Sequence, residues 1–494
     1  MRKVLIKDIN QEKMIKKYTY FLILVISCIS LSCEKWDDRI SLTDAALGRN
    51  LSEQIASQAD LSKFRELLVK SGYDKLISAS QNYTVFAPSN KALEGFDMAS
   101  LKDSASIKAF VGNHIALQSY PMPATNTETS IKLLNGKYAT LNKGLFGESP
   151  ISTANTYVGN GVLHILDKYS PVLPNLWTYI NGSKGEFAQN KLIANLTYSS
   201  FNPQKAIIDS ISGTTGRPIY RPGSGFEIKN QFTDAVYDLN DESKQYTYFI
   251  LNDQALTTEI NKVSPFFKTS AADSTYNASA WNVVKDLAVE GYYTPDKLPD
   301  VFKSKFGVEI PLNKSSIVKT IKLSNGIAYV FNKVDFKLQE KIQPIVVEAE
   351  TGFTLMQNIT ASTIAILEKR NPNTNLTTRH ILIAGHGVTN FWLRYRIPQL
   401  PAAKYKVYWV AVNDQTRPNY TSSGVTPPAT LTQRLAMGNV TNTTFANVTV
   451  TLNNFSEVLL GEYSTNRLGT LDIFLQGSGT TPMVLDYVRL VPVL

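Results

Sequence analysis

Cysteine is almost absent from this chain of 494 residues: Cys28 and Cys33 are the only two. Both lie close to the N-terminus, so the rest of the chain has neither a disulfide nor a thiolate metal site. Only four histidines are present, and no zinc-binding helix motif, phosphate-binding loop or dinucleotide fingerprint occurs. A catalytic pair of carboxylates would leave no local motif, but no hydrolase layout is recognisable. We therefore expect a protein that is not an enzyme.

Dense blocks of Lys and Arg are also missing from the body of the chain. The formal net charge is +9, but six of the basic residues lie within the first 17 positions. Nucleic-acid binding requires a basic patch or stripe on the folded part of a protein. We therefore expect no nucleic-acid partner.

No run of about 20 apolar residues, the length that crosses a bilayer as a helix, occurs either. The apolar stretch at residues 18–31 is shorter, and it follows Lys16 and Lys17. A short apolar stretch behind a positive end is typical of a secretory signal peptide. Either Met1 or Met14 can serve as its start.

The end of this stretch resembles a lipoprotein processing site, with Ser32 before Cys33. The resemblance implies that residues 1–33 are a signal peptide and that Cys33 is lipidated, which anchors the chain to a membrane. Cys28 fits the local pattern too, but cleavage there leaves an apolar new N-terminus. The acidic stretch 34–38 resembles surface-export signals of lipoproteins in glycan-foraging Gram-negative bacteria. It implies an outer-membrane location facing the exterior, with the periplasmic side as the alternative and an outer-membrane glycan importer as a candidate partner.

Two pairs of segments repeat at nearly the same spacing. Residues 83–93 match residues 246–256 without gaps, 163 positions apart, and residues 160–168 match residues 325–333, 165 positions apart. Two matches in the same order are improbable by chance. A period this long indicates a duplicated domain and not a solenoid.

The first copy resembles the fasciclin domain. It has Thr-Val-Phe-Ala-Pro-Ser-Asn-Lys-Ala at residues 84–92, Asn-His at residues 113–114, and Asn-Gly before an apolar strand at residues 160–168. The resemblance implies a β-sandwich flanked by helices over residues 34–177, with adhesion or ligand binding and no catalysis. We interpret the motif residues as fold determinants, and His114 and His164 as hydrogen-bonded core histidines.

The second copy, residues 178–338, is diverged. It lacks the Ala-Pro pair, and residues 284–287 in the middle of the domain include no histidine.

After a charged boundary at residues 337–343 the pattern becomes all-β. Residues 390–397 alternate apolar and polar side chains, a period of two, and further short strands follow. The expected fold is multidomain, α+β and all-β: two fasciclin-like wedges of β-sandwich and helices, then a jelly-roll β-sandwich at residues 343–494.

The two ends of this last domain resemble carbohydrate-binding jelly-roll modules. It opens with Val-Glu-Ala-Glu at residues 347–350 and closes with Leu-Asp-Tyr-Val at residues 485–488. The resemblance implies a structural calcium ion held by Glu348, Glu350 and Asp486, whose carboxylates are the hard oxygen ligands that calcium prefers. The alternative is that both glutamates are solvated residues of an edge strand.

Sugar-binding modules of this kind stack a sugar ring on an aromatic side chain at a loop rim. The candidate glycan-binding residues here are Trp409, Asn413, Asp414, Tyr420 and Trp392. Val484 stands where these modules have an Asn, so the usual cleft is incomplete. The alternative for both tryptophans is a place in the core.

The leading functional hypothesis is a cell-surface lipoprotein that binds extracellular polysaccharide and assists its capture. The second is an adhesin that binds a surface protein or matrix through its fasciclin domains, and the third is a structural spacer. Exposed aromatic residues on residues 345–494 would favour sugar. A large apolar patch on residues 40–335 would favour a protein partner.

Overall fold

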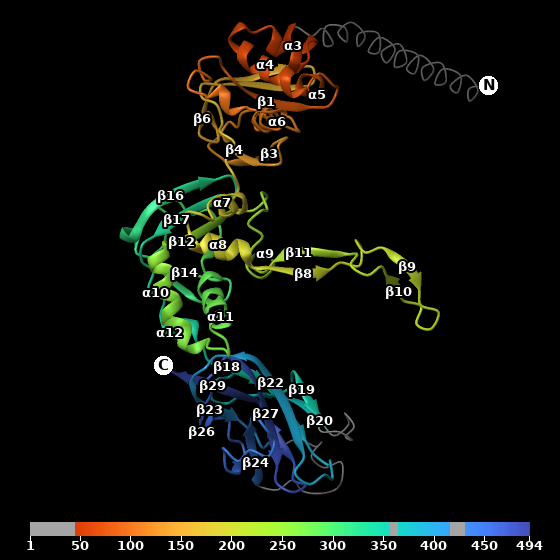
Figure 1. Cartoon of the computed structure of the whole chain (residues 1–494), viewed down its shortest axis with the longest axis vertical. Helices are drawn as coiled ribbons and strands as arrows, with labels where there is room; N and C mark the ends of the chain where they lie inside the picture. The colour runs from red at the N-terminus through yellow and green to blue at the C-terminus, as the bar shows by residue number, and fades with distance from the viewer. Residues whose placement is uncertain (1–44, 356–363, 415–429) are drawn as a thin grey trace, which may run out of the picture. The chain divides into compact units, whose positions relative to one another are not determined.

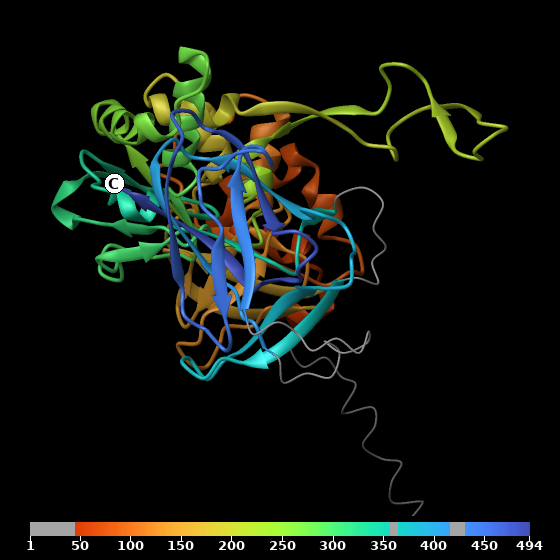
Figure 2. The same cartoon turned by 90° about the horizontal axis from the view of Figure 1, so that it is seen from below.

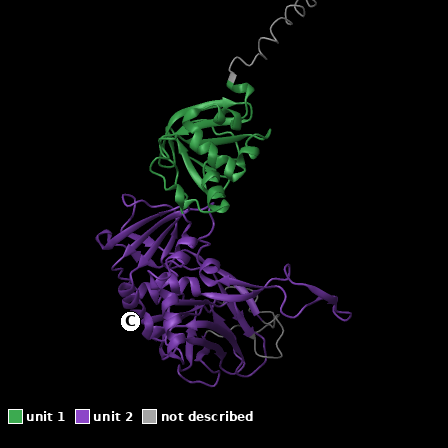
Figure 3. Cartoon of the chain, turned by 45° about the horizontal axis from the view of Figure 1, so that its top comes forward, with its two compact units in different colours: residues 1–173 green, residues 174–494 purple. Residues whose placement is uncertain are grey.

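The computed structural model describes residues 45–355, 364–414 and 430–494. The expected signal peptide with Cys33, and the candidate residue Tyr420, lie outside these ranges. The described part divides into two compact units, and the chain passes from the first to the second between Leu173 and Pro174 (Figure 3). Within it, no helix has the length and apolar character needed to span a membrane.

The first unit is built on one seven-stranded sheet with helices packed beside it (Figure 1). The strand order is β2-β1-β7-β6-β5-β4-β3. The strands are β1 (Tyr83–Pro88), β2 (Ile115–Ala116), β3 (Thr129–Lys132), β4 (Tyr138–Asn142), β5 (Leu145–Phe146), β6 (Ser149–Val158) and β7 (Gly161–Leu166). The helices are α3 (Leu51–Ala56), α4 (Ser62–Ser71), α5 (Tyr73–Leu76) and α6 (Ser104–Gly112).

Strand β1 lies between β2 and β7, and all six of its residues are buried. Its burial on both faces explains why its sequence is apolar without alternation. Helix α4 ends at Gly72, whose φ of 76° lies in the left-handed region that glycine adopts without strain. Gly72 alone separates α4 from α5.

The second unit starts with the second copy of the repeat. Its four-stranded sheet has the order β13-β12-β17-β16, and β14 and β15 form a separate pair. The strands are β12 (Tyr246–Leu251), β13 (Ala288–Glu290), β14 (Val301–Lys303), β15 (Glu309–Pro311), β16 (Ile317–Leu323) and β17 (Gly326–Phe331). The helices are α7 (Leu176–Gly182), α8 (Ala188–Asn195), α9 (Gln231–Ala235), α10 (Asp253–Val263), α11 (Ala272–Val284) and α12 (Leu338–Lys341).

The two copies share the same strand register. In the first, β1 runs parallel to β7 with Tyr83 opposite Gly161; in the second, β12 runs parallel to β17 with Tyr246 opposite Gly326. A Cβ atom on Gly161 would lie 2.0 Å from the carbonyl oxygen of Tyr83, and one on Gly326 would lie 2.2 Å from that of Tyr246. Both strand pairs therefore require glycine at this position.

The asparagine before each of these glycines makes the same three hydrogen bonds. Asn160 Oδ1 accepts from the backbone of Leu51 at 2.8 Å, and its Nδ2 donates to two backbone carbonyls just before β1. Asn325 Oδ1 accepts from the backbone of Leu176 at 2.8 Å, and its Nδ2 donates to two carbonyls just before β12. The similarity read from the sequence is therefore a duplicated fold, down to individual hydrogen bonds.

An extended insertion, residues 197–230, distinguishes the second copy, and we call it the β-arm. It lies between α8 and α9, where the first copy has only Gly72 between α4 and α5. Two successive two-stranded ribbons build it: β8 (Thr197–Phe201) with β11 (Phe226–Asn230), and β9 (Ile208–Ile211) with β10 (Pro218–Tyr220). Both views show it projecting from the helices of the second copy (Figures 1 and 2). Its two ends meet, since the backbone of Gln231 donates to the carbonyl of Leu196 at 2.7 Å.

The rest of the second unit is a β-sandwich. One sheet has the order β18-β29-β23-β26, another β19-β22-β27-β24-β25, and a third β20-β21-β28. The strands are β18 (Ile345–Glu348), β19 (Phe353–Leu355), β20 (Ile364–Arg370), β21 (Thr377–Ile383), β22 (Trp392–Leu400), β23 (Lys404–Val410), β24 (Thr430–Met437), β25 (Val448–Thr451), β26 (Val458–Ser464), β27 (Gly469–Gly477), β28 (Met483–Leu485) and β29 (Tyr487–Val493). The expected fold class, α+β wedges followed by a jelly-roll sandwich, is confirmed.

Two large hydrophobic cores and one small cluster, formed by Val410, Val412 and Phe455, lie in the described part of the second unit. One large core extends from Leu176 to Ile342 and the other from Ala349 to Leu490. The sandwich is bonded to the second copy by two backbone hydrogen bonds of 2.7 Å, which the carbonyls of Phe266 and Lys268, just after α10, accept from it. The first unit ends four residues before the expected boundary at residue 177, since Leu176 already belongs to the second copy's core.

Candidate functional site

The histidines of the first copy serve its fold. His114 is fully buried, its Nδ1 lies 2.9 Å from the carbonyl oxygen of Phe110, and its Nε2 accepts from the backbone of Ser170 at 3.1 Å. Burial lowers the pKa of His114 to about 4, so the ring is neutral at pH 7. His164 is buried too, with Nε2 3.0 Å from the carbonyl oxygen of Tyr120. The interpretation of both as hydrogen-bonded core residues is confirmed.

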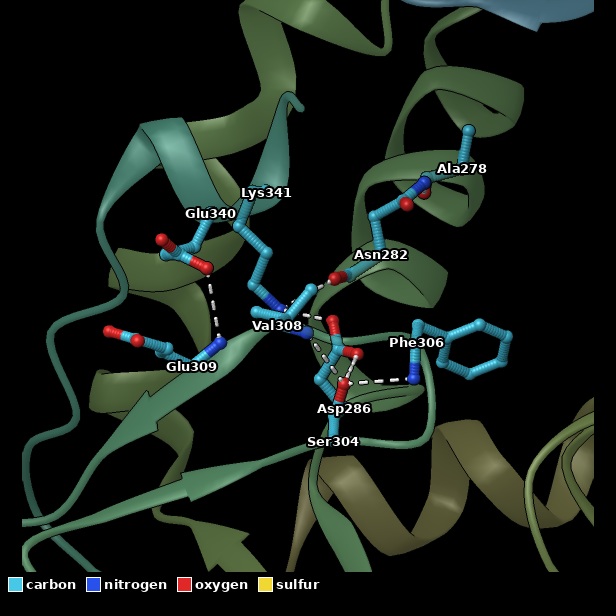
Figure 4. Close-up of polar contacts among 9 residues, drawn as sticks. All are labelled: Ala278, Asn282, Asp286, Ser304, Phe306, Val308, Glu309, Glu340 and Lys341. Atoms are coloured by element: carbon cyan, nitrogen blue, oxygen red, sulfur yellow. Dashed lines mark hydrogen bonds and ion pairs between the residues drawn. The ribbon is translucent and has the colours of Figure 1, made fainter. Parts of the chain in front are cut away.

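In the second copy, a buried ion pair forms at Asp286, one residue before the position that corresponds to His114. The Lys341 ammonium lies 2.7 Å from the carboxylate of Asp286, and it also donates to the carbonyl of Asn282 at 2.9 Å (Figure 4). The hydroxyl of Ser304 donates to the other Asp286 oxygen at 2.6 Å. Sequence reasoning missed this pair, because 55 residues separate the two charges and nothing local connects them. With every polar atom engaged and both side chains out of solvent, the pair is structural.

The three carboxylates expected to hold calcium come together where the sandwich closes. Strands β18 and β29 pair antiparallel, with Glu348 opposite Tyr487. Asp486 is 3% exposed, and burial together with the charges of Glu348 and Glu350 raises its pKa to about 6. Burial and the Glu350 charge also raise the pKa of Glu348. The sequence thus located a real cluster of acidic side chains.

One carboxylate oxygen of these three residues has no partner among the described residues. Glu350 Oε1 pairs with Arg379 at 3.2 Å, while its Oε2 is buried and finds no hydrogen-bond partner among the residues that the structure describes. An unpartnered buried carboxylate oxygen is costly unless a cation or donor compensates it. Across the described ranges, however, no three His, Cys, Asp or Glu side chains are gathered closely enough to enclose a metal ion by themselves. Backbone carbonyl oxygens would have to supply the remaining ligands.

The four expected glycan-binding residues that the structure describes do not form an open site. Trp409 is 1% exposed and lies in the core of the sandwich, so the prediction that it stacks on a sugar is wrong. Asn413 and Asp414 are also buried, and Asp414 pairs with Lys369 at 2.6 Å, so neither lies at an open rim. Trp392 is half-buried, edge-on to Phe474 with ring centres 5.3 Å apart. Of the four candidates that the structure describes, Trp392 is the one whose side chain is only partly buried.

The exposed apolar side chains gather elsewhere, on the β-arm. Of the 26 large hydrophobic side chains exposed in the described ranges, eight lie between residues 198 and 228. By contrast, no aromatic side chain of the described part of the sandwich falls in the exposed class. Sequence reasoning did not single out the β-arm, although the alternation of apolar and polar residues at 226–229 was available as a strand signal.

Comparison with known proteins bears mainly on the first copy. The family model of the fasciclin domain matches residues 59–169, and no curated protein matches the chain. Among solved structures, the domain pair of the insect cell adhesion molecule fasciclin I is 14% identical over 57% of this chain and 99% of its own, with a TM-score of 0.23. A family 35 carbohydrate-binding module from Clostridium thermocellum is 13% identical over 31% of this chain and 99% of its own, with a TM-score of 0.21. The family match identifies residues 59–169 as a fasciclin domain.

Proposed function

We propose that this chain is a non-catalytic binding protein, held outside the cell by a lipid on Cys33, whose C-terminal sandwich binds glycan. The observation that supports this most is the closure of the sandwich by its first and last strands, with Glu348, Glu350 and Asp486 brought together there. This is the arrangement implied by the resemblance to carbohydrate-binding jelly-roll modules. Calcium held by these carboxylates would neutralise them and join the two strands.

The test is a glycan array with the mature chain, residues 34–494, in calcium and in chelator. We expect binding to a polysaccharide, and we expect Trp392→Ala to weaken it at least tenfold, because stacking on an aromatic face is lost. Tyr276→Ala is the matched control, since Tyr276 is a 50% exposed aromatic on the second copy, far from the sandwich in sequence. Silence of the folded chain across a broad array would overturn the glycan proposal.

Attachment to a protein is the second candidate function, and the β-arm favours it. Contiguous exposed apolar surface on a folded protein commonly marks an interaction site. The fasciclin domain at residues 59–169 is compatible with an adhesive role. The two candidates use different parts of the chain, so variants in one part leave the other testable.

A further inference from the structure

The β-arm carries more exposed apolar surface than any stretch of comparable length in the described chain. Its eight large exposed hydrophobic side chains are between 42% and 73% exposed. They are Tyr198, Phe201, Ile207, Ile208, Ile211, Ile219, Phe226 and Ile228. A two-stranded ribbon is at best marginally stable alone in water. An apolar ribbon that persists therefore calls for a surface to cover it.

The strand register collects part of this surface on one face. Phe226 pairs with Phe201, and Ile228 pairs with Ser199. Directly opposed residues share a face of an antiparallel pair, and every second residue returns to it. Phe201, Phe226 and Ile228 therefore lie on one face, and the two phenylalanine ring centres are 5.5 Å apart. Within the described ranges β8 and β11 pair only with each other, so their outer edges are open as well.

The charges of the β-arm are largely paired within it. Lys205 lies 2.6 Å from the Glu227 carboxylate, and Lys229 lies 3.6 Å from its other oxygen. Arg221 lies 2.9 Å from Asp209. A partner selected by charge would have to compete with these pairs. The surface that remains to be covered is apolar, which is the character of interfaces between identical subunits.

Counted over both of its faces, the β-arm offers an area comparable to one side of a stable interface. If a fully exposed large side chain presents about 200 Å², the eight exposed side chains together present about 900 Å², of which Phe201, Phe226 and Ile228 supply about 350 Å². A standard interface buries about 800 Å² on each partner. Apolar faces without charge are also self-complementary, as a two-fold contact between identical chains requires.

We propose that the β-arm is a self-association surface, through which two copies of this chain pack their arms together about a two-fold axis, with Phe201, Phe226 and Ile228 in the contact. This inference deepens the second candidate function by naming the partner as a second copy. It does not depend on glycan binding.

The test is the concentration dependence of the molar mass of residues 34–494, measured by sedimentation. We expect a monomer–dimer equilibrium for the unchanged chain, and at least tenfold weaker association for the double variant Phe226→Ser, Ile228→Ser. A chain in which one glycine replaces residues 197–230 copies the α4–Gly72–α5 junction of the first copy, and should be monomeric. Val318→Ser is the matched control, because Val318 is a 58% exposed apolar residue of β16 outside the arm, and it should associate normally.

Three results would overturn the proposal. The first is a monomer at all concentrations up to about 100 μM, and the second is a dimer that survives removal of the β-arm. The third is a monomer that binds phosphatidylcholine vesicles only when the arm is present, which would assign the arm to a lipid surface instead. Glycan binding measured on the arm-deleted chain shows separately whether the sandwich functions.

Discussion

Lys341 and Asp286 form an ion pair 2.7 Å long in which neither side chain is more than 1% exposed. The ring of Phe336 lies 3.7 Å from the ammonium. Burial lowers the pKa of Lys341 to about 8, although the neighbouring carboxylate opposes this change. Lys341 is the last residue of α12, just before the sandwich begins, so the pair fastens the end of the second copy to its interior.

The first copy has a neutral residue at the position of Asp286. The strand registers, Val85 opposite Ile115 and Tyr248 opposite Ala288, place Asp286 where the first copy has Asn113. Asn113 is neutral, and its amide donates to Ser170 and to a neighbouring carbonyl. A charge introduced at this buried position requires a compensating charge, which Lys341 supplies.

Lys341→Met should therefore be strongly destabilising, because it leaves the Asp286 carboxylate buried without its cation. We expect a loss of about 3–5 kcal/mol in the unfolding free energy of the second unit. Adding Asp286→Asn should recover most of that loss. Urea unfolding of residues 34–494 would measure both effects. Lys319→Met is the control, since the Lys319–Glu186 pair is about half exposed and should contribute less than about 1 kcal/mol. Equal effects of the two lysine variants would contradict the prediction.

Gly161→Ala and Gly326→Ala should each unfold their own copy. The added Cβ would lie 2.0 or 2.2 Å from a backbone oxygen of the paired strand, and backbone in a sheet centre cannot move aside cheaply. We expect losses of more than about 3 kcal/mol, seen by calorimetry as loss of one unit's transition. Gly95→Ala and Gly182→Ala are controls with open space around the new atom. A normal transition in either glycine variant would show that the strand pair can shift.

These glycines also show why the repeat was readable from the sequence. The Tyr–Gly register and the asparagine contacts permit few substitutes, so Asn160-Gly161 and Asn325-Gly326 survive in both copies although the surrounding residues differ. Residues that are identical at such positions indicate that the two copies share a backbone geometry. The acidic cluster of the sandwich was also predictable, since the first and last strands of a jelly roll are neighbours.

The sequence prediction for Trp409, by contrast, was wrong, because this residue is buried in the core and not exposed at a loop rim. It alternates with Tyr405 and Val407 in β23, and all three are buried, so the period of two already indicated a core position. The β-arm was harder to recognise. Alternation of apolar and polar residues in a strand predicts that its apolar face is buried. Only the fold shows that the described residues leave the apolar face of the β-arm exposed. The Asp286–Lys341 pair depends on tertiary contacts that no local pattern encodes.

Acid should destabilise the first unit through His114. Its pKa is about 4 in the fold against about 6.5 unfolded, so the unfolded chain binds the proton first. The stability present above pH 6.5 is lost as the pH falls towards 4, by about 3 kcal/mol at most. His114→Leu, which copies Leu287 of the second copy, should flatten this pH dependence. It should also cost about 1–3 kcal/mol at pH 7, because two backbone groups lose their partner. An unchanged slope of unfolding free energy between pH 6.5 and 4 would exclude His114 as the cause.

Asp486 should give the stability of the second unit the opposite pH dependence. Burial and two neighbouring carboxylates raise the pKa of Asp486 to about 6, so the fold favours its protonated form. The stability that protonation gives is complete below the unfolded pKa of about 3.9 and is lost as the pH rises through 6. In chelator, Asp486→Asn should therefore raise the unfolding temperature of the second unit at pH 8 and leave it unchanged at pH 3.

The same variant tests the metal. Calcium added at pH 8 should raise the unfolding temperature of the unchanged chain and have a smaller effect on Asp486→Asn, because the ion removes the repulsion that the substitution has already relieved. Asp472→Asn is the control, and in chelator it should lower the unfolding temperature instead of raising it. The Arg396 guanidinium lowers the pKa of Asp472, and the substitution removes that attraction. If calcium does not change the unfolding temperature of the unchanged chain at pH 8, then Arg379, and not a metal ion, balances the charge of Glu350.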